Sequence, residues 1–242
     1  MKTNFLRAVP VITLIIVFFS CNACDYYLDQ VIGNGQITEE FRSLKKFTGI
    51  QAGGSFDIML VQGDEPSLII EADENLMDFI RTEVVGQTLK LSTEARFLNI
   101  SKLKVTIVFD QLNDIRLSGA ARLRTADPLQ SRNIDLRMSG ASTASIELYA
   151  GDLDARLSGA SKLQLVGKVE ELEGRLSGSS RLQAYDTELE ECSLRTSGAS
   201  KAEVLVTEEL DFRGSGSSTV YYKGSPSKIS TKTSGASSVV KR

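Results

Sequence analysis

Histidine and tryptophan are absent from this 242-residue chain, and cysteine occurs only three times. Without histidine, the chain can form neither a histidine-dependent catalytic triad nor a histidine-ligated metal site. A single cysteine in the C-terminal half, Cys192, cannot build a thiolate zinc site. These absences exclude several common catalytic classes.

Aromatic residues make up only 7% of the chain, and the formal net charge is only −3. Small repeating coils have little room for large rings, so the shortage of aromatics suits a repeat fold. A nucleic-acid-binding domain normally carries a strongly basic surface, so nucleic acid is not expected as the partner. Apolar residues still make up 41% of the chain, which is enough for a sizeable core.

A four-residue phrase, Ser-Gly followed by two small residues, recurs seven times in the second half of the chain. Its glycines, which are 18 to 21 residues apart, are Gly119, Gly140, Gly159, Gly178, Gly198, Gly216 and Gly235. Such a period indicates a solenoid, in which each repeat forms one coil. Polar and apolar residues alternate before each glycine, as in a strand, and glycine permits the tight corner that follows.

A coil of about 19 residues is too short for a strand, a helix and a return, but it can hold two or three short strands. We therefore predict an all-β, single-domain parallel β-helix, for which right-handed crossovers are the default. Coils about 4.8 Å apart would align equivalent residues in columns. The sequence divides into a leader (1–20), a tether (21–40) and a β-helix head (41–242), with an irregular part (41–110) before the seven coils (111–242).

The irregular part predicts a degenerate coil and a cap. Residues 48–60 repeat the later pattern, with Gly53-Gly54-Ser55 at the corner. Residues 74–81 predict one or two helical turns that begin after Asp73 as N-cap. Further strands are expected at 67–71, 88–92 and 103–109. We expect this part to shield one end of the solenoid, because an open end exposes unpaired backbone.

The N-terminus has the pattern of an export signal. Basic residues precede an apolar run at 9–19 that is too short to span a bilayer comfortably. Ser20 before Cys21 resembles a bacterial lipoprotein cleavage box, although Phe18 replaces the usual leucine. We expect lipid on Cys21, which would anchor the exported chain to the envelope, at the periplasmic or surface face of the outer membrane. A plain cleaved leader or modification of Cys24 are the alternatives.

Cys192 occupies a position that is apolar in most other coils. We therefore predict that it is a buried, inert core residue. A disulfide with Cys24 is the alternative in an oxidising compartment.

Each repeat carries a base two residues before its serine, and five of the seven repeats carry an acid two residues earlier still. The bases are Arg116, Arg137, Arg156, Arg175, Arg195, Arg213 and Lys232. The acidic positions hold Asp114, Asp135, Asp154, Glu173, Ser193, Asp211 and Ser230. Stacking would turn both sets into neighbouring columns, whose charges offset each other.

The basic column is the candidate binding site, because arginine forms charge-assisted hydrogen bonds with acidic glycans and with lipid phosphates. The alternative is a solvated face that is neutralised by the acids and resists lateral sheet addition. Any binding bias should be strongest near Ser193 and Ser230, where the acids are missing, and Tyr221 or Tyr222 could stack on a sugar there. The acids could in principle hold a cation, but their spacing predicts pairing with the bases, and we expect neither a metal site nor a cofactor.

Three segments in order carry a family resemblance: Phe47-Thr48-Gly49-Ile50, Gly63-Asp64-Glu65 and the stretch from Glu71 to Leu76. Followed by Ser-Gly coils, they resemble the bacterial family described as "putative auto-transporter adhesin, head GIN domain". The resemblance covers about residues 40–240. It implies a pectin-lyase-like β-helix on a secreted or lipid-anchored envelope protein, a role in adhesion, and no agreed catalytic residues.

The sequence therefore favours a non-catalytic envelope lipoprotein whose β-helix binds envelope or host glycans, or another envelope protein. Two alternatives stay open. A polysaccharide-active enzyme would need a groove with at least three converging carboxylates, or with a base near them. A periplasmic scaffold would have no extracellular ligand.

Overall fold

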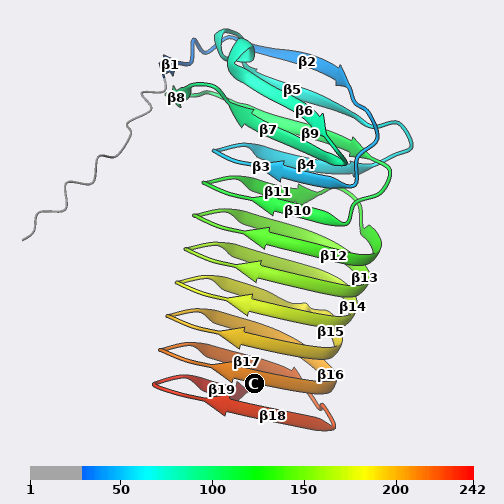
Figure 1. Ribbon diagram of the computed structural model, residues 1–242, viewed down its shortest axis with the longest axis vertical. Helices are drawn as coiled ribbons and strands as arrows, with labels where there is room; N and C mark the ends of the chain where they lie inside the picture. The colour runs from blue at the N-terminus through cyan, green and yellow to red at the C-terminus, as the bar shows by residue number, and fades with distance from the viewer. Residues whose placement is uncertain (1–28) are drawn as a thin grey trace, which may run out of the picture.

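Residues 29–242, which the computed structural model describes, form a two-layered β-solenoid covered at its N-terminal end by a mixed sheet (Figure 1). Equivalent strands of successive coils pair in parallel. The predicted all-β parallel β-helix is therefore confirmed. Cys21 and Cys24 lie outside the described residues, and no helix within residues 29–242 is long and apolar enough to cross a membrane.

The coils are built from long strands with one sharp corner each. The strands are β10 (Asp114–Leu117), β11 (Arg122–Thr125), β12 (Leu129–Met138), β13 (Thr143–Leu157), β14 (Lys162–Leu176), β15 (Arg181–Thr196), β16 (Lys201–Gly214), β17 (Thr219–Gly224), β18 (Lys228–Thr233) and β19 (Ser238–Lys241). Instead of two or three short strands, β13 to β16 each run 14 to 16 residues from one Ser-Gly corner to the next. The edge opposite the corner is therefore bent but still hydrogen-bonded.

The Ser-Gly corner is a stacked turn. Gly159, for example, has a φ of +70°, which suits glycine because it lacks a Cβ. The next residue, Ala160, donates its N–H to the carbonyl oxygen of Gly140 in the preceding coil at 2.8 Å. The same bond recurs at the other repeats, so the glycines form a hydrogen-bonded column along one edge.

The predicted early coil is present. It consists of β3 (Gly49–Ala52) and β4 (Asp57–Gln62), with Gly54 at the corner at a φ of +90°. β10 pairs in parallel with β3, and β11 pairs in parallel with β4. After this coil the chain forms the cap, and it then returns to the other side of the coil to begin the repeats. Residues 49–62 therefore lie between the cap and the seven repeats (Figure 1).

The cap continues both layers with strands of mixed direction. Its elements are β1 (Gln30–Ile32), β2 (Ile37–Ser43), β5 (Ser67–Asp73), η1 (Glu74–Phe79), β6 (Ile80–Val85), β7 (Thr88–Thr93), β8 (Arg96–Leu98) and β9 (Leu103–Phe109). β7 and β9 pair in parallel with β3 and β4, whereas β6, β5 and β2 add antiparallel strands. Residues 29–40, which the sequence assigned to a tether, are therefore partly folded into the head.

The helical turn is present as the 3-10 helix η1, which begins after Asp73 as predicted, but the Asp73 side chain makes no capping hydrogen bond. Asp73 is fully buried and accepts hydrogen bonds from the N–H groups of Gly35 (2.7 Å), Ser101 (2.9 Å) and Lys102 (3.3 Å). Burial alone would raise the pKa of Asp73, but these N–H donors hold it below its usual value. The carboxylate thus joins three segments of the cap.

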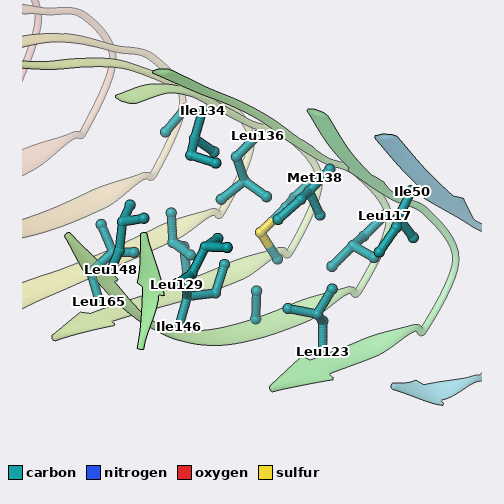
Figure 2. Packing of buried hydrophobic residues seen from close by; sticks show 14 of the residues in the cluster. Ile50, Leu117, Leu123, Leu129, Ile134, Leu136, Met138, Ile146, Leu148 and Leu165 are labelled. Atoms are coloured by element: carbon teal, nitrogen blue, oxygen red, sulfur yellow. The ribbon is translucent and has the colours of Figure 1, made fainter. Parts of the chain in front are cut away.

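The core lies between the two layers. Inward residues alternate with outward ones, so that Leu103, Val105 and Ile107 of β9 are buried while the residues between them are half-exposed. Figure 2 shows side chains of the two layers facing each other, including Leu136 and Met138 from one and Ile146 and Leu148 from the other. Stacked aliphatic columns of this kind stabilise the solenoid by removing apolar surface from water.

Candidate binding groove

The strand register places the predicted bases in one continuous column. Arg116 is aligned with Arg137, Arg137 with Arg156, and the alignment continues through Arg175, Arg195 and Arg213 to Lys232. All of these residues point outward from the layer formed by β3, β10, β18 and the C-terminal halves of β12 to β16. We call this outer surface the arginine face. The surface of the layer containing β4, β11, β17 and β19 is the opposite face.

The acidic residues form the neighbouring column, as expected, and pair with the bases. Within the coils, Arg116 contacts Asp114 at 2.6 Å, Arg175 contacts Glu173 at 2.6 Å, and Arg213 contacts Asp211 at 3.2 Å. Two further pairs of this kind are Arg137–Asp135 and Arg156–Asp154. These pairs pull the guanidinium groups toward the acidic column, away from the Ser-Gly corner.

Several arginines also reach the acid of the preceding coil. Arg156 lies 3.5 Å from Asp135, and Arg175 lies 3.7 Å from Asp154. Arg195 has Ser193 at its own acidic position and contacts only Glu173 of the preceding coil, at 3.6 Å. Its side chain is 51% exposed, as is that of Arg213, which has its own acid. The missing acid therefore leaves Arg195 with one longer ion pair, but its side chain is no more exposed than that of Arg213.

A groove of about 550 Å³ runs along the arginine face between the arginine column and the serines of the corners. Its first wall contains Arg116, Arg137, Arg156, Arg175 and Arg195, with Gln51 at one end. Its second wall contains Ser118, Ser139, Ser158, Ser177 and Ser197. We call it the arginine groove. Because it crosses successive coils, it runs along the solenoid axis rather than along any strand.

The floor of the arginine groove is the chain between the two walls. It includes Leu117, Met138, Leu157, Leu176 and Thr196, whose side chains point into the core and are at most 4% exposed. The aliphatic stems of the arginines border this floor. The groove therefore has a floor of strand backbone and takes its apolar surface chiefly from the arginine stems, with guanidinium donors on one side and hydroxyl groups on the other.

The serine wall is partly held by hydrogen bonds to the backbone. Ser118, Ser158 and Ser177 each donate to a carbonyl oxygen of the preceding coil, at 3.3 to 3.5 Å. The fourth residue of the phrase closes the turn from inside, since Ser200 and Ser218 donate to the carbonyl oxygens of Ser197 and Ser215 at 3.1 Å. The outer hydroxyl oxygens can still accept hydrogen bonds from a ligand.

Other predicted positions are placed less favourably for binding. The Tyr221 ring lies under Lys201 Nζ (4.8 Å) and the Arg242 guanidinium (4.6 Å), which compete with a sugar for it. Tyr222 is half-buried against the core. Within residues 29–242, no group of three histidine, cysteine, aspartate or glutamate side chains is arranged to hold a metal ion.

Cys192 is buried, as predicted, between Leu172 and Leu210 of the adjacent coils. Burial raises the pKa of its thiol well above the usual value. It is the single cysteine of the described region, so the alternative disulfide with Cys24 stays untested.

The sequence located the basic column but missed the groove. The Ser-Gly phrase predicted only the corner of each coil. The base and the serine that form the two walls of the groove are two positions apart on one strand face. The recurrence of a base and a serine, two positions apart, before each glycine was the available signal. It did not reveal that ion pairing draws the guanidinium groups away from the serines and leaves a groove between the two columns.

Solved structures share this fold. A "putative adhesin" from Bacteroides fragilis NCTC 9343 is 23% identical, with a TM-score of 0.82, over 88% of this chain and 100% of that chain. A "putative adhesin" from Parabacteroides merdae ATCC 43184 is 20% identical, with a TM-score of 0.73, over 88% and 99%. A "putative lipid binding protein" from Parabacteroides distasonis ATCC 8503 is 22% identical, with a TM-score of 0.74, over 88% and 100%.

No curated protein is similar to the chain. Residues 46–226 match the family described as "Putative auto-transporter adhesin, head GIN domain". The match covers the early coil, most of the cap and all but the last of the repeats.

Proposed function

The chain belongs to the auto-transporter adhesin head GIN domain family, and on this basis we propose that it is a non-catalytic, lipid-anchored adhesion module of the cell envelope. Its ligand is an extended anionic chain, such as an acidic glycan, that lies in the arginine groove. The observation that carries the proposal is the groove itself, which places five arginines in register along one channel.

The repeated geometry suits a repeated ligand. Five arginines about 4.8 Å apart offer donors at regular intervals along about 19 Å. Each guanidinium has five N–H donors, so its bond to an acidic neighbour leaves others for a carboxylate or sulfate. The serine hydroxyls on the other wall can bond sugar hydroxyl groups. A polymer therefore gains one similar set of contacts from each coil.

The acidic column supports binding rather than catalysis. A polysaccharide lyase or hydrolase would concentrate its carboxylates at one place, whereas Asp135, Asp154 and Glu173 are spread over successive coils and engage arginines. Paired carboxylates of this kind are poorly placed to hold a cation or to remove a proton from a sugar.

A lipid is the second candidate ligand, because the aliphatic stems of the arginines give the groove apolar surface beside their charged groups. An acyl chain would lie along these stems, and the guanidinium groups would contact its anionic head group. One relative is described as a "putative lipid binding protein". A lipid would gain most of its affinity from this apolar surface, whereas an acidic glycan would gain it from the guanidinium groups and lose it in salt.

Replacing Arg156, Arg175 and Arg195 together with serine tests the binding site. Binding to acidic glycans on an array should fall at least tenfold, since three charge-assisted contacts are lost. The matched control replaces Arg122, Lys162 and Arg181 with serine, because these residues form a basic column on the opposite face. Equal binding by both triple variants, with unchanged thermal unfolding, contradicts the proposal.

The anchor has a separate test. Metabolic labelling with a radioactive fatty acid should mark the wild-type chain but not a Cys21→Ser variant. Protease treatment of whole cells then distinguishes an outward-facing adhesin, which is degraded, from a periplasmic scaffold, which is protected. Label retained in the Cys21→Ser chain would move the anchor to another residue, and full protection would contradict a surface role.

A further inference from the structure

The cap carries exposed apolar side chains that the core and the arginine groove do not use. Phe41 is 67% exposed, Ile37 is 45% exposed and Ile69 is 39% exposed. Phe41 is aligned with Ile69 across the antiparallel pair of β2 and β5. Ile37 lies on the same side of β2, four residues away, with exposed Glu39 between it and Phe41. We call these three residues the apolar N-terminal patch.

Half-exposed apolar residues extend this patch toward the first coil. Ile69 is aligned with Thr106 of β9, and Thr106 is aligned with Met59 of β4. Val61 and Val108 are neighbours in the next column on the same surface. Phe41 and Ile69 thus form an exposed apolar pair, with Met59, Val61 and Val108 beyond Thr106, and exposed apolar side chains grouped in this way often mark an interaction site.

The position of the patch favours one occupant. It belongs to β2 and β5 at the N-terminal end of the solenoid, far from the last coil (Figure 1). The described chain begins at Asp29, and Cys21 precedes it by eight residues, which can span at most about 29 Å. A lipid on Cys21 therefore holds this end of the protein, and not the distal coils, next to the bilayer.

We propose that the apolar N-terminal patch rests on the bilayer surface, with Phe41 inserted among the head groups and upper acyl chains. This inference rests on the lipid anchor of the proposed function. Such an anchor holds the chain at the bilayer but does not orient the domain, and an apolar protein contact beside it fixes which face meets the lipid. Aromatic and aliphatic side chains at the head of a tethered domain supply such a contact.

The arrangement also leaves the arginine groove free. β2, β5, β9 and β4 belong to the layer of the opposite face, whereas the groove is on the layer of β3 and β10. Contact of the patch with a bilayer therefore turns the groove toward the medium. The charged row between Ile37 and Phe41, where Glu71 pairs with Lys102 and Lys104, would remain at the level of the head groups.

Tryptophan fluorescence tests the inference, because the chain has no tryptophan of its own. A full-length, lipidated Phe41→Trp chain is reconstituted in phosphatidylethanolamine–phosphatidylglycerol vesicles with brominated acyl chains. We expect a blue-shifted emission and at least threefold stronger quenching than for the control, Val240→Trp. Val240 is also an exposed apolar residue of the opposite face, but it lies on β19 at the far end.

The possible outcomes distinguish the membrane contact of the patch from the lipid anchor. A chain that sediments with vesicles but shows equal, weak quenching in both variants keeps the anchor and overturns the patch contact. A chain that does not sediment overturns the anchor and, with it, this inference. Protection of the Phe41→Trp indole from iodide without vesicles, increasing with protein concentration, would show that a second copy covers the patch and would also overturn it.

Discussion

At the scale of single residues, the corner glycines are fixed by two independent requirements. A Cβ on Gly159 would lie 2.6 Å from the carbonyl oxygen of Gly140, and the residue also has a positive φ. Backbone atoms of the neighbouring coil cannot move aside without breaking the column of hydrogen bonds. The repeat phrase is therefore a consequence of stacking, which explains why glycine recurs in all seven coils.

Gly159→Ala and Gly86→Ala separate the two requirements. Gly86 has a φ of +64°, but a Cβ added there would meet no heavy atom within 4 Å, so alanine incurs only the backbone cost. We expect that cost to be about 1–2 kcal/mol, and the loss at Gly159 to be at least twice as large. Urea unfolding measures both. Equal losses would show that the close approach to Gly140 is relieved by a small shift.

Asp73 makes the stability of the cap depend on pH. Its folded-state pKa lies below the unfolded value, so its stabilising contribution is complete above the unfolded pKa of about 4 and is lost as the pH falls through the folded pKa. Asp73→Asn should destabilise the protein by about 1–3 kcal/mol at neutral pH, because an amide cannot satisfy all three N–H donors.

Chemical unfolding at pH 7 and pH 3 measures this contribution. The wild-type protein should lose more stability between the two values than Asp73→Asn does, since the variant no longer has this carboxylate to protonate. Glu71→Gln provides a comparison at an ion-paired carboxylate, whose pKa is lowered by Lys102 and Lys104. An identical pH dependence in the wild type and Asp73→Asn would contradict the role given to Asp73.

At the scale of elements, the last coil differs from the others at its inward positions. Thr231 of β18 is aligned with buried Phe212, and Lys241 of β19 is aligned with half-buried Tyr222. Polar residues at positions that are apolar elsewhere suit contact with water, and lysines discourage the addition of further strands. The two ends of the solenoid are thus protected differently, by a folded cap and by a polar coil.

Thr231→Leu tests the protective role of this coil. The change should produce concentration-dependent association through the exposed coil, which analytical ultracentrifugation would detect as an increasing sedimentation coefficient. Ser230→Leu is the control, because Ser230 occupies the outward acidic position of the same strand. If neither variant associates, or if both associate to the same extent, the inward position has no special role in preventing association.

The elements also show what sequence patterns can predict. Period-two alternation identified the repeats, and it placed β9 at its observed bounds, because a half-buried strand imposes that pattern directly. The antiparallel contacts of β2 with β5 were not predictable, since pairing direction leaves no mark in the alternation. The position of Asp73 before the helix could be predicted, but the role of its side chain could not, because its partners, Gly35 and Ser101, are distant in sequence.

At the scale of the whole molecule, the two surfaces proposed for binding lie on opposite faces. The apolar N-terminal patch is at the end nearest the proposed anchor, and the arginine groove runs along the other face toward the distal coils. The basic column could be predicted because the bases recur at a regular spacing in the sequence. The groove could not, because it depends on how ion pairs tilt the arginine side chains.

The central claim is that the arginine groove holds an extended anionic chain along the solenoid axis. Isothermal titration with oligogalacturonates of increasing length tests it most directly, at low and high salt. The affinity should increase with length until the chain spans the five arginines, about 19 Å, and then level off, and salt should weaken it. Affinity that is independent of chain length, or no binding at any length, would contradict the claim.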